Sequence, residues 1–507
     1  VLCAYNLFDG TPFCGNSLFM ILILNEQWGF DGYVTSDCGA VYNFYKFHKT
    51  HPDAVHASAD AVIHGTDLDC GSDYRKLVDA VNQGLITERQ INVSLRKLFA
   101  TRFKLGMFDP ESIVSYTDIP YSILEDERHQ QHALKMAKES MVLLENKNNI
   151  LPLSKNIKKI ALIGPNADNA DTQLGKYNGF PSKTVTVLNA LEDRFGKKNI
   201  IYDKGIDYTK PLNSKASLKS IANKASKADV IIYVGGISPR LEGEEGDAGK
   251  DGLEGFMGGD RTDIALPKIQ TELMKELKAT GKPVIFVCMS GSAIAMQWEA
   301  ENIDGILQAW DGGQSAGTAV ADILFGYYNP SGRLPVTFYK SNDDLPHFHD
   351  YSMNNRTYRY FKGEPLYPFG YGLSYTQFKY DAINSPANIG TSQDLILNVN
   401  VSNIGKKDGD EVVQLYVTHK TVDSKVPIRS LQAFKKVSLK AGESKEVTFI
   451  LTPKNLALTD SYGNLVEKAG SIDIYIGGGQ PDETDLNAGK CVKSIVNITG
   501  NDFEILN

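Results

Sequence analysis

Two groups of carboxylates follow predicted strands, at positions from which they could act as nucleophile or as general acid. The first is Asp37, in the segment 29–40 (GFDGYVTSDCGA), directly after a short run of strand-forming residues. A carboxylate at the carboxyl end of a strand is where α/β barrel enzymes place catalytic groups. The other interpretation is that Asp37 caps the next helix, a frequent role of aspartate.

The second group is Glu242-Gly243-Glu244-Glu245, in a glycine-rich stretch that follows the predicted strand 230–235. Because the stretch has neither helical nor strand periodicity, we expect a loop at the carboxyl edge of a sheet, where open α/β sheets bind ligands. Three acids within four residues repel one another, which tends to raise the pKa of at least one of them, as a general acid requires. The alternative is a solvated acidic loop.

Two carboxylates with different roles are what glycosidic bond cleavage requires. One attacks the anomeric carbon or stabilises its positive charge, and the other protonates the leaving oxygen. A carboxylate on one domain and an acidic loop on the next would place the scissile bond in the cleft between the domains, a common position for small-molecule sites.

Residues 1–110 alternate short apolar segments with helical ones. This order predicts parallel βα units. A barrel needs about eight strands, so we interpret 1–110 as the last part of a larger or truncated α/β domain. Strands are expected at 1–5, 32–37 and 66–70, and helices at 16–28, 53–63 and within 74–103.

Residues 111–144 are expected to form a connector that is helical from 126 to 139. In residues 145–345 predicted strands again alternate with predicted helices. We expect an open, mostly parallel sheet with helices on both faces. Its segment ALIGPNAD lacks the glycine patterns of nucleotide-binding loops. The expected strands are 159–164, 230–235, 282–289 and 305–310, with helices such as 268–277 and 315–325 between them.

The sequence pattern changes at residue 346 and again at residue 391. Residues 346–390 are rich in aromatic residues and glycine, so we expect an irregular linker that packs on other parts of the protein. From 391 to 507 apolar residues alternate with polar ones, and turn signals separate the alternating stretches. We therefore expect a small antiparallel β-sandwich there.

The composition argues against several classes of partner. The 507 residues are 42% hydrophobic and 22% charged, which is typical of a soluble globular protein. A net charge of −8 argues against nucleic acid, and no apolar run is long enough to span a bilayer. Without a CxxC pair we expect no zinc site. We therefore expect no nucleic acid, membrane, metal or cofactor.

Six cysteines are too few for a disulfide scaffold. Cys3 with Cys14, and Cys38 with Cys70, would pair if the ends of their strands are neighbours, and buried free thiols are the alternative. The chain begins at Val1 inside an expected strand. We therefore expect that the true start lies upstream, so that a signal peptide cannot be judged.

Several segments stand in one order along nearly the whole chain: GFDGYVTSDCGA, GTDLDC, VLLENKNNILPL, GKYNGFPSKTVT, LEGEEG, GGDRTDIALP, GQSAGTAVADILFGYYNPSGRLPVTF and PFGYGLSYTQFKY. This set resembles glycoside hydrolase family 3. Cys38 directly after the carboxylate, together with GKYNGFPS, is similar to the β-xylosidase branch more than to the glucosidase branch.

The resemblance implies a fold of three parts: the C-terminal part of a (β/α)8 barrel, an α/β sandwich with a mostly parallel sheet, and a fibronectin type III-like β-sandwich. It places Asp37 on the family's nucleophile and Glu244 on its general acid/base, with Glu245 as the next candidate. Tyr5 matches the tyrosine that holds the nucleophile in place, and a core aromatic is the alternative.

The resemblance also implies a retaining exo-glycosidase, secreted or periplasmic, that removes terminal β-linked xylose or glucose from oligosaccharides. Arg261 and Arg333 are expected to brace loops rather than to touch sugar. The family's further sugar-binding residues, a Lys-His pair and an Asp, come from earlier strands and match no residue here. The alternatives are a β-glucosidase, an α-L-arabinofuranosidase, or a non-catalytic remnant that contacts carbohydrate.

Overall fold

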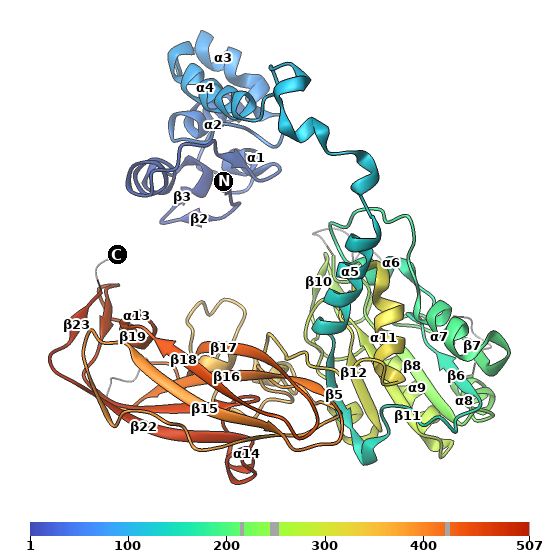
Figure 1. Ribbon diagram of the computed structural model, residues 1–507. Helices are drawn as coiled ribbons and strands as arrows, with labels where there is room; N and C mark the ends of the chain where they lie inside the picture. The colour runs from blue at the N-terminus through green and yellow to red at the C-terminus, as the bar shows by residue number, and fades with distance from the viewer. Residues whose placement is uncertain (213–216, 244–252, 421–425, 506–507) are drawn as a thin grey trace. The chain divides into compact units, whose positions relative to one another are not determined.

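The computed structural model describes residues 1–212, 217–243, 253–420 and 426–505. The chain forms two compact units, Val1–Ile123 and Leu124–Asn507. Both units are drawn in Figure 1, where the first is blue to cyan.

The first unit is built around a parallel pair of short strands, β1 (Leu2–Cys3) and β4 (Thr35–Ser36). A single bridge joins Thr35 to Leu68. The paired stretches are shorter than the sequence predicts. At their ends, backbone amides donate to side chains instead of to the carbonyls of a neighbouring strand. Asp67 accepts the amide of Val34 over 2.9 Å, and Ser36 Oγ accepts the amide of Cys70 over 2.9 Å.

Helices surround this pair, close to where the sequence predicts them. The predicted helix 16–28 is present with π-type hydrogen bonding as η2 (Leu18–Gln27). Gly84, at φ 72°, lies between a short helix, α3 (Leu77–Asn82), and a long one, α4 (Glu88–Lys104). The remaining elements are a hairpin of β2 (Leu7–Phe8) and β3 (Thr11–Pro12), η1 (Phe13–Gly15), α1 (Ala40–Lys46), α2 (Ala54–Ile63), η3 (Asp73–Lys76), η4 (Glu111–Ile113), η5 (Ser115–Asp118) and η6 (Tyr121–Ile123).

The second unit begins with α5 (Glu127–Ser140), which leads into a six-stranded sheet of order β5-β12-β11-β8-β6-β7. All neighbours are parallel except β5, which runs antiparallel to β12. The open, mostly parallel sheet is confirmed. Its strands are β5 (Val142–Asn146), β6 (Ile160–Ile163), β7 (Ile200–Asp203), β8 (Val230–Gly236), β11 (Val284–Met289) and β12 (Gly305–Gln308).

Helices cover both faces of this sheet, as predicted (Figure 1). One face packs against α8 (Leu218–Ala225) and α9 (Lys268–Ala279), and the other against α5, α7 (Val187–Phe195) and α11 (Ala316–Leu324). Because the central strands are buried on both faces, their sequences are continuous apolar runs. Shorter elements in this part are η7 (Lys147–Asn149), α6 (Ala170–Leu174), η8 (Lys197–Asn199), β9 (Phe256–Met257), β10 (Asp260–Arg261), α10 (Gln297–Asn302) and η9 (Gly313–Ser315).

The aromatic segment after this sheet packs on it, as its composition suggests. The hydroxyl of Tyr367 donates to Glu145 over 2.9 Å, and that of Tyr371 donates to the carbonyl of Leu144 over 3.1 Å. The short helix α12 (Thr357–Tyr360) lies in this segment, and η10 (Asn342–Asp344) lies just before it. It therefore fastens the end of the α/β part to strand β5.

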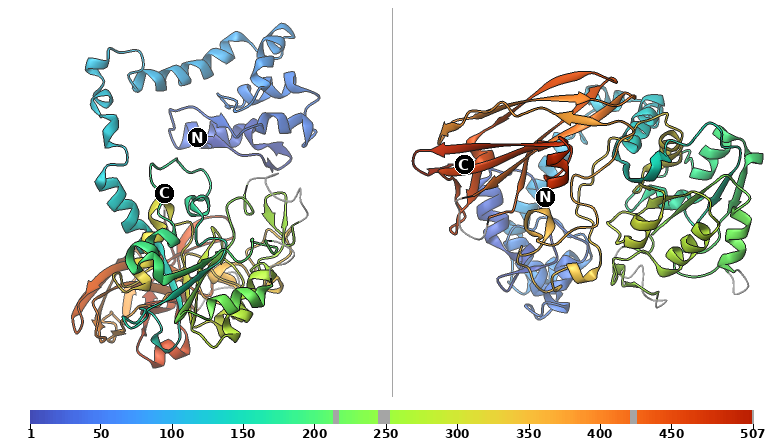
Figure 2. Two further views of the ribbon diagram at one scale, coloured as in Figure 1. Left: turned by 90° about the vertical axis from the view of Figure 1, so that its right-hand side faces the viewer. Right: turned by 90° about the horizontal axis from the view of Figure 1, so that it is seen from below.

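The C-terminal part is a β-sandwich, drawn in orange and red in Figures 1 and 2. The predicted alternation is confirmed, since Leu395, Leu397, Val399 and Val401 are all buried. One sheet contains β13 (Phe378–Tyr380), β15 (Leu395–Asn403) and β18 (Ser444–Leu451). The other contains β14 (Asn388–Gly390), β22 (Cys491–Thr499), β21 (Gly470–Gly477), β16 (Gly409–His419) and β17 (Ser430–Leu439). Flanking elements are α13 (Pro453–Leu456), β19 (Ala457–Thr459), β20 (Leu465–Glu467), α14 (Glu483–Asn487) and β23 (Phe503–Glu504).

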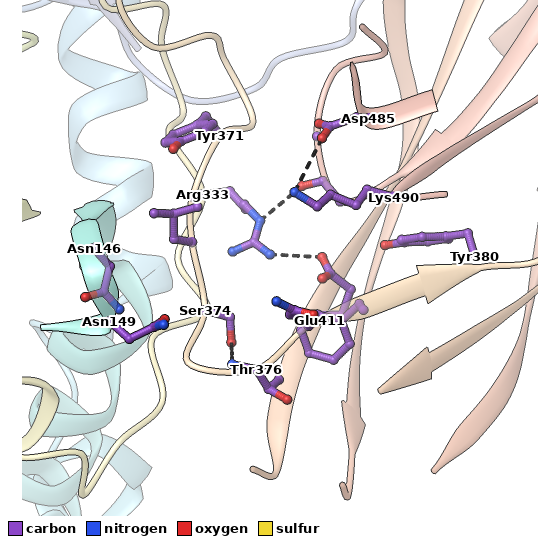
Figure 3. Close-up of a pocket in the computed structure, with 16 residues that line it drawn as sticks. Asn146, Asn149, Arg333, Tyr371, Ser374, Thr376, Tyr380, Glu411, Asp485 and Lys490 are labelled. Atoms are coloured by element: carbon purple, nitrogen blue, oxygen red, sulfur yellow. Dashed lines mark hydrogen bonds and ion pairs between the residues drawn. The ribbon is translucent and has the colours of Figure 1, made fainter. Parts of the chain in front are cut away.

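Arg333 joins the α/β part to the sandwich, beside a pocket of about 310 Å³ (Figure 3). Its guanidinium donates to Glu411 over 2.9 Å and to the carbonyl of Gly478 over 3.1 Å. It also donates to the carbonyls of Ser331 and Gly332. Arg333 therefore braces loops, as expected.

Candidate active site

Asp37 follows β4 directly, and two donors hold one of its carboxylate oxygens. The hydroxyl of Tyr5 lies 3.1 Å from Asp37 Oδ1, and the amide of Cys38 donates to the same oxygen over 2.7 Å. The Tyr5 hydroxyl is also 2.7 Å from the carbonyl oxygen of Cys38. No described residue of the first unit donates to Oδ2, so that oxygen is available for chemistry.

The cap interpretation of Asp37 is wrong. Helix α1 begins after Gly39, which has φ 77° and supplies no side-chain cap. The Asp37 side chain instead accepts from Tyr5 and from its own following amide. Only its backbone carbonyl takes part in the turn, where it accepts the amide of Ala40 over 3.0 Å.

A disulfide fastens this strand end to the next extended segment. Cys38 is bonded to Cys70, and the amide of Gly39 donates to the carbonyl of Cys70 over 2.7 Å. Cys3 is bonded to Cys14 as well. Both pairings that the sequence left open therefore form, and Cys288 and Cys491 are buried free thiols.

The acidic loop leaves the sheet at the carboxyl end of β8, as predicted. The amides of Leu241 and Glu242 donate to the carbonyl of Ser238, which makes one helical turn after the strand. The amide of Gly243 then donates to the carbonyl of Gly259 over 3.2 Å. Glu244 and Glu245, the acid/base candidates, lie outside the described residues.

Glu242 is bound at the beginning of this loop. Its Oε1 accepts a short hydrogen bond from Ser292 Oγ, and Arg261 Nη1 lies 3.9 Å from the same oxygen. Arg261 also donates to Ser292 Oγ over 3.0 Å and to the carbonyl of Ala293 over 2.8 Å. Arg261 braces two loops, as expected, and its burial lowers the pKa of the guanidinium.

Asp311 is a second carboxylate at this edge that the sequence analysis did not select. It follows β12, and burial together with the nearby charge of Glu242 raises the pKa of its carboxyl to about 6. A Cβ on Gly291 would lie 3.1 Å from Asp311 Oδ2 and 3.9 Å from Glu242 Oε2, so the absence of a side chain there makes room for both acids. Its position after an apolar strand was the signal that could have identified it.

Asp37 belongs to the first unit and the acidic loop to the second. The roles of Asp37, Tyr5, Glu244 and Glu245 therefore stay predictions. Within the described residues, no group of three or more acidic, histidine or cysteine side chains is arranged to hold a metal ion. In the same residues, no helix is both long and apolar enough to cross a membrane.

Comparison with known proteins decides the family. Residues 1–101 match the glycosyl hydrolase family 3 N-terminal domain, residues 141–375 the glycosyl hydrolase family 3 C-terminal domain, and residues 411–480 a fibronectin type III-like domain. A xylan 1,4-beta-xylosidase of Xylanibacter ruminicola is 36% identical over 95% of this chain and 72% of its own length. The chain belongs to glycoside hydrolase family 3. This membership confirms the predicted class of fold and the glycoside hydrolase class.

Other family 3 relatives cover the same length of chain. A periplasmic beta-glucosidase of Salmonella typhimurium is 31% identical over 94% of this chain and 66% of its own length. The solved structure of a family 3 exo-beta-xylosidase with a xylobiose aziridine probe matches 100% of this chain and 66% of its own, with TM-score 0.86 and 28% identity. A beta-glucosidase of Listeria innocua with laminaribiose matches 99% and 68%, with TM-score 0.83 and 26% identity. The chain thus spans about two thirds of the length of these relatives.

Proposed function

We propose that this protein removes terminal β-linked xylose from oligosaccharides with retention of configuration. The observation that carries the proposal is the setting of Asp37, whose Oδ1 is held by Tyr5 and by the amide of Cys38 at a strand end. The preference for xylose is supported by the segments GFDGYVTSDCGA and GKYNGFPS and by the relative named as a xylosidase.

In the first step Asp37 Oδ2 attacks the anomeric carbon, and the bond from that carbon to the leaving oxygen breaks. Glu244 donates a proton to that oxygen, and a glycosyl-aspartate ester forms. In the second step Glu244 takes a proton from water, and the water oxygen displaces Asp37. In retaining enzymes generally the two carboxyl groups lie about 5–5.5 Å apart.

The hydrogen bonds on Oδ1 suit both steps. When Oδ2 forms the ester, Oδ1 becomes the ester carbonyl oxygen and still accepts from Tyr5 and from the Cys38 amide. When the ester breaks, negative charge returns to a carboxylate that is already oriented by two donors. Such preorganised donors stabilise developing charge without reorganisation.

Replacement of Asp37 tests the proposal. In Asp37→Ala, turnover of an aryl β-xyloside should fall by about 10⁴-fold or more, because no covalent intermediate can form. Asp31→Asn is the matched control, since Asp31 is an exposed acid of the same unit whose partner is Lys104. Near-normal turnover in Asp37→Ala would rule out the proposed nucleophile.

Substrate comparison tests the sugar. We expect a higher kcat/KM on aryl β-xylosides than on β-glucosides or α-L-arabinofuranosides. A preference for glucosides would favour the β-glucosidase alternative, which the Salmonella relative supports. Failure to turn over any of the three would favour a carbohydrate-contacting protein without activity.

The same proposal places the protein outside the cytoplasm, either secreted or periplasmic. Its support is the pair of disulfides in the first unit, since such bonds persist in oxidising compartments. The Salmonella relative is named as periplasmic. Fractionation of cells that express the full-length protein tests this location.

A further inference from the structure

The pocket beside Arg333 contains a buried hydroxyl that has no hydrogen-bond partner in the part of the chain that the structure describes. It belongs to Tyr380 of strand β13, a residue that is 3% exposed. The hydroxyl end of the ring points toward Arg333 and Glu411 (Figure 3). Buried polar groups are as a rule hydrogen-bonded, and phenylalanine would fill the same space without a polar atom. The hydroxyl of Tyr380 therefore indicates a ligand.

The pocket has the size of a site for a small molecule. Its volume is about 310 Å³, at the lower end of the range of about 300–1,000 Å³ that ligand sites span. One water molecule takes up only about 30 Å³. A single bridging water would therefore leave most of the pocket unused.

The charged groups at the pocket compensate each other. Arg333 and Glu411 form an ion pair of 2.9 Å, with side chains 9% and 4% exposed. Lys490 and Asp485 lie 3.7 Å apart and are more exposed, at 62% and 33%. Because each positive charge has a negative one beside it, the pocket favours neither an anion nor a cation. An uncharged ligand fits this arrangement.

Both polar and apolar groups line the pocket. Asn149 and Gln377 carry amide groups, and Tyr371 and Phe378 carry aromatic rings. A sugar unit presents hydroxyl groups at its edge and C–H groups on its faces, so it uses both kinds of surface. Burial raises the pKa of Tyr380 well above its ordinary value, so the hydroxyl stays protonated. It can then both donate to and accept from a sugar hydroxyl.

We propose that this pocket is a second, non-catalytic binding site for one uncharged sugar unit, with Tyr380 as its central hydrogen-bonding residue. Hydrolysis of a glycosidic bond at the end of an oligosaccharide releases such units. The inference goes beyond the proposed reaction and does not depend on it, because no residue of the pocket belongs to the proposed catalytic set.

Tyr380→Phe is the sharpest test, because it removes only the hydroxyl. A sugar hydroxyl that loses this partner stays unsatisfied, so the affinity of the pocket for xylose should fall about 10-fold. A ligand that binds the folded protein raises its unfolding midpoint. Xylose should therefore raise the midpoint less in Tyr380→Phe than in wild type. Xylose bound at the proposed active site contributes equally in both proteins, so the difference belongs to the pocket.

Tyr375→Phe is the matched control. It removes a hydroxyl that donates to the carbonyl of Ile323 over 2.9 Å, and Tyr375 is not among the residues that line the pocket. Without sugar, the midpoint of Tyr375→Phe should fall and that of Tyr380→Phe should not. With xylose, Tyr375→Phe should show the full rise of wild type.

An osmolyte separates binding from general stabilisation. Trimethylamine N-oxide, which has no hydroxyl group and stabilises folded proteins by exclusion from their surface, should raise the midpoints of wild type and both variants equally. An equal rise with xylose in wild type and Tyr380→Phe would overturn the proposal.

Crystals of the wild-type protein soaked in xylose locate the ligand directly. We expect density for one sugar within hydrogen-bond distance of Tyr380 Oη, and density for water alone would overturn the site. Tyr380→Phe should turn over an aryl β-xyloside as fast as wild type. If wild type turns over no xyloside, the proposed function fails, whereas the pocket is still judged by the soaked crystals and by the midpoints with xylose.

Discussion

The hydroxyl of Tyr5 lies 3.1 Å from Oδ1 of Asp37, although 32 residues separate the two in sequence. The parallel register of β1 and β4 brings them together, since it pairs Cys3 with Ser36. Each side chain stands just beyond the end of its strand. The Tyr5 hydroxyl therefore contacts both the carboxylate and the carbonyl of Cys38, which fixes the turn around Asp37.

Tyr5→Phe should lower kcat on aryl β-xylosides by about 10- to 100-fold, because a hydrogen bond to a charged group contributes about 1.5–3 kcal/mol. The ring stays in place, so the unfolding midpoint should change little. Steady-state kinetics and urea unfolding check both expectations. Tyr42→Phe, in the same unit, is the control, and full activity in Tyr5→Phe would show that the bond is not needed.

The Cys38–Cys70 disulfide should stabilise the first unit by about 3–4 kcal/mol, because it closes a loop of 32 residues in the unfolded chain. Replacing both cysteines by serine should lower the unfolding midpoint and also reduce activity, because the disulfide holds the turn from which the residue 38 amide donates to Asp37. Denaturant unfolding and kinetics of the double variant measure the two effects. An unchanged midpoint would mean that the unfolded state is not constrained by this bond.

Much of the fold could be predicted because the order of apolar and polar residues along a strand depends on which of its faces are buried. Strands β8 and β11 are buried on both faces and read as unbroken apolar runs, and β15 alternates because one face is exposed. Strand β7 was not predicted, since it lies at the edge of the sheet and all its residues are only half-buried. Strand β5 was not predicted as a strand either, because its run ends in the polar Glu145 and Asn146.

The candidate site was less predictable, because its contacts are long-range. Asp37 could be selected from its place after a strand. The contact of Tyr5 with it was expected only from the family resemblance, since the register of two strands cannot be read from spacing. Nothing local relates Glu242 to Ser292, and their bond depends on how β8 and β11 pair.

Arg333 and Glu411 form a buried ion pair between the α/β part and the sandwich, with side chains 9% and 4% exposed. Arg333→Ala should destabilise the protein by about 3–5 kcal/mol, because it leaves a carboxylate buried without its partner. The double variant Arg333→Met with Glu411→Leu should lose clearly less than the sum of the single losses. Chemical denaturation of the variants tests this, and strictly additive losses would contradict a coupled pair.

The carboxyl of Asp311 should make stability depend on pH, because burial and the charge of Glu242 raise its pKa from 3.8 to about 6. The folded protein therefore keeps a proton that the unfolded chain releases above about pH 4. The stability that this proton contributes is complete below about pH 4 and is lost as the pH rises through about 6.

Asp311→Asn cannot lose a proton, so its stability relative to wild type should increase from pH 4 to pH 6 and then level off. A pKa shift of this size sets an upper bound of about 3 kcal/mol on the increase. Urea unfolding of both proteins between pH 3.5 and pH 7.5 measures the difference. Glu242→Gln should move the transition to lower pH, since it removes the neighbouring negative charge. Parallel stability curves for Asp311→Asn and wild type would show that Asp311 ionises as freely in the folded protein as in the unfolded chain.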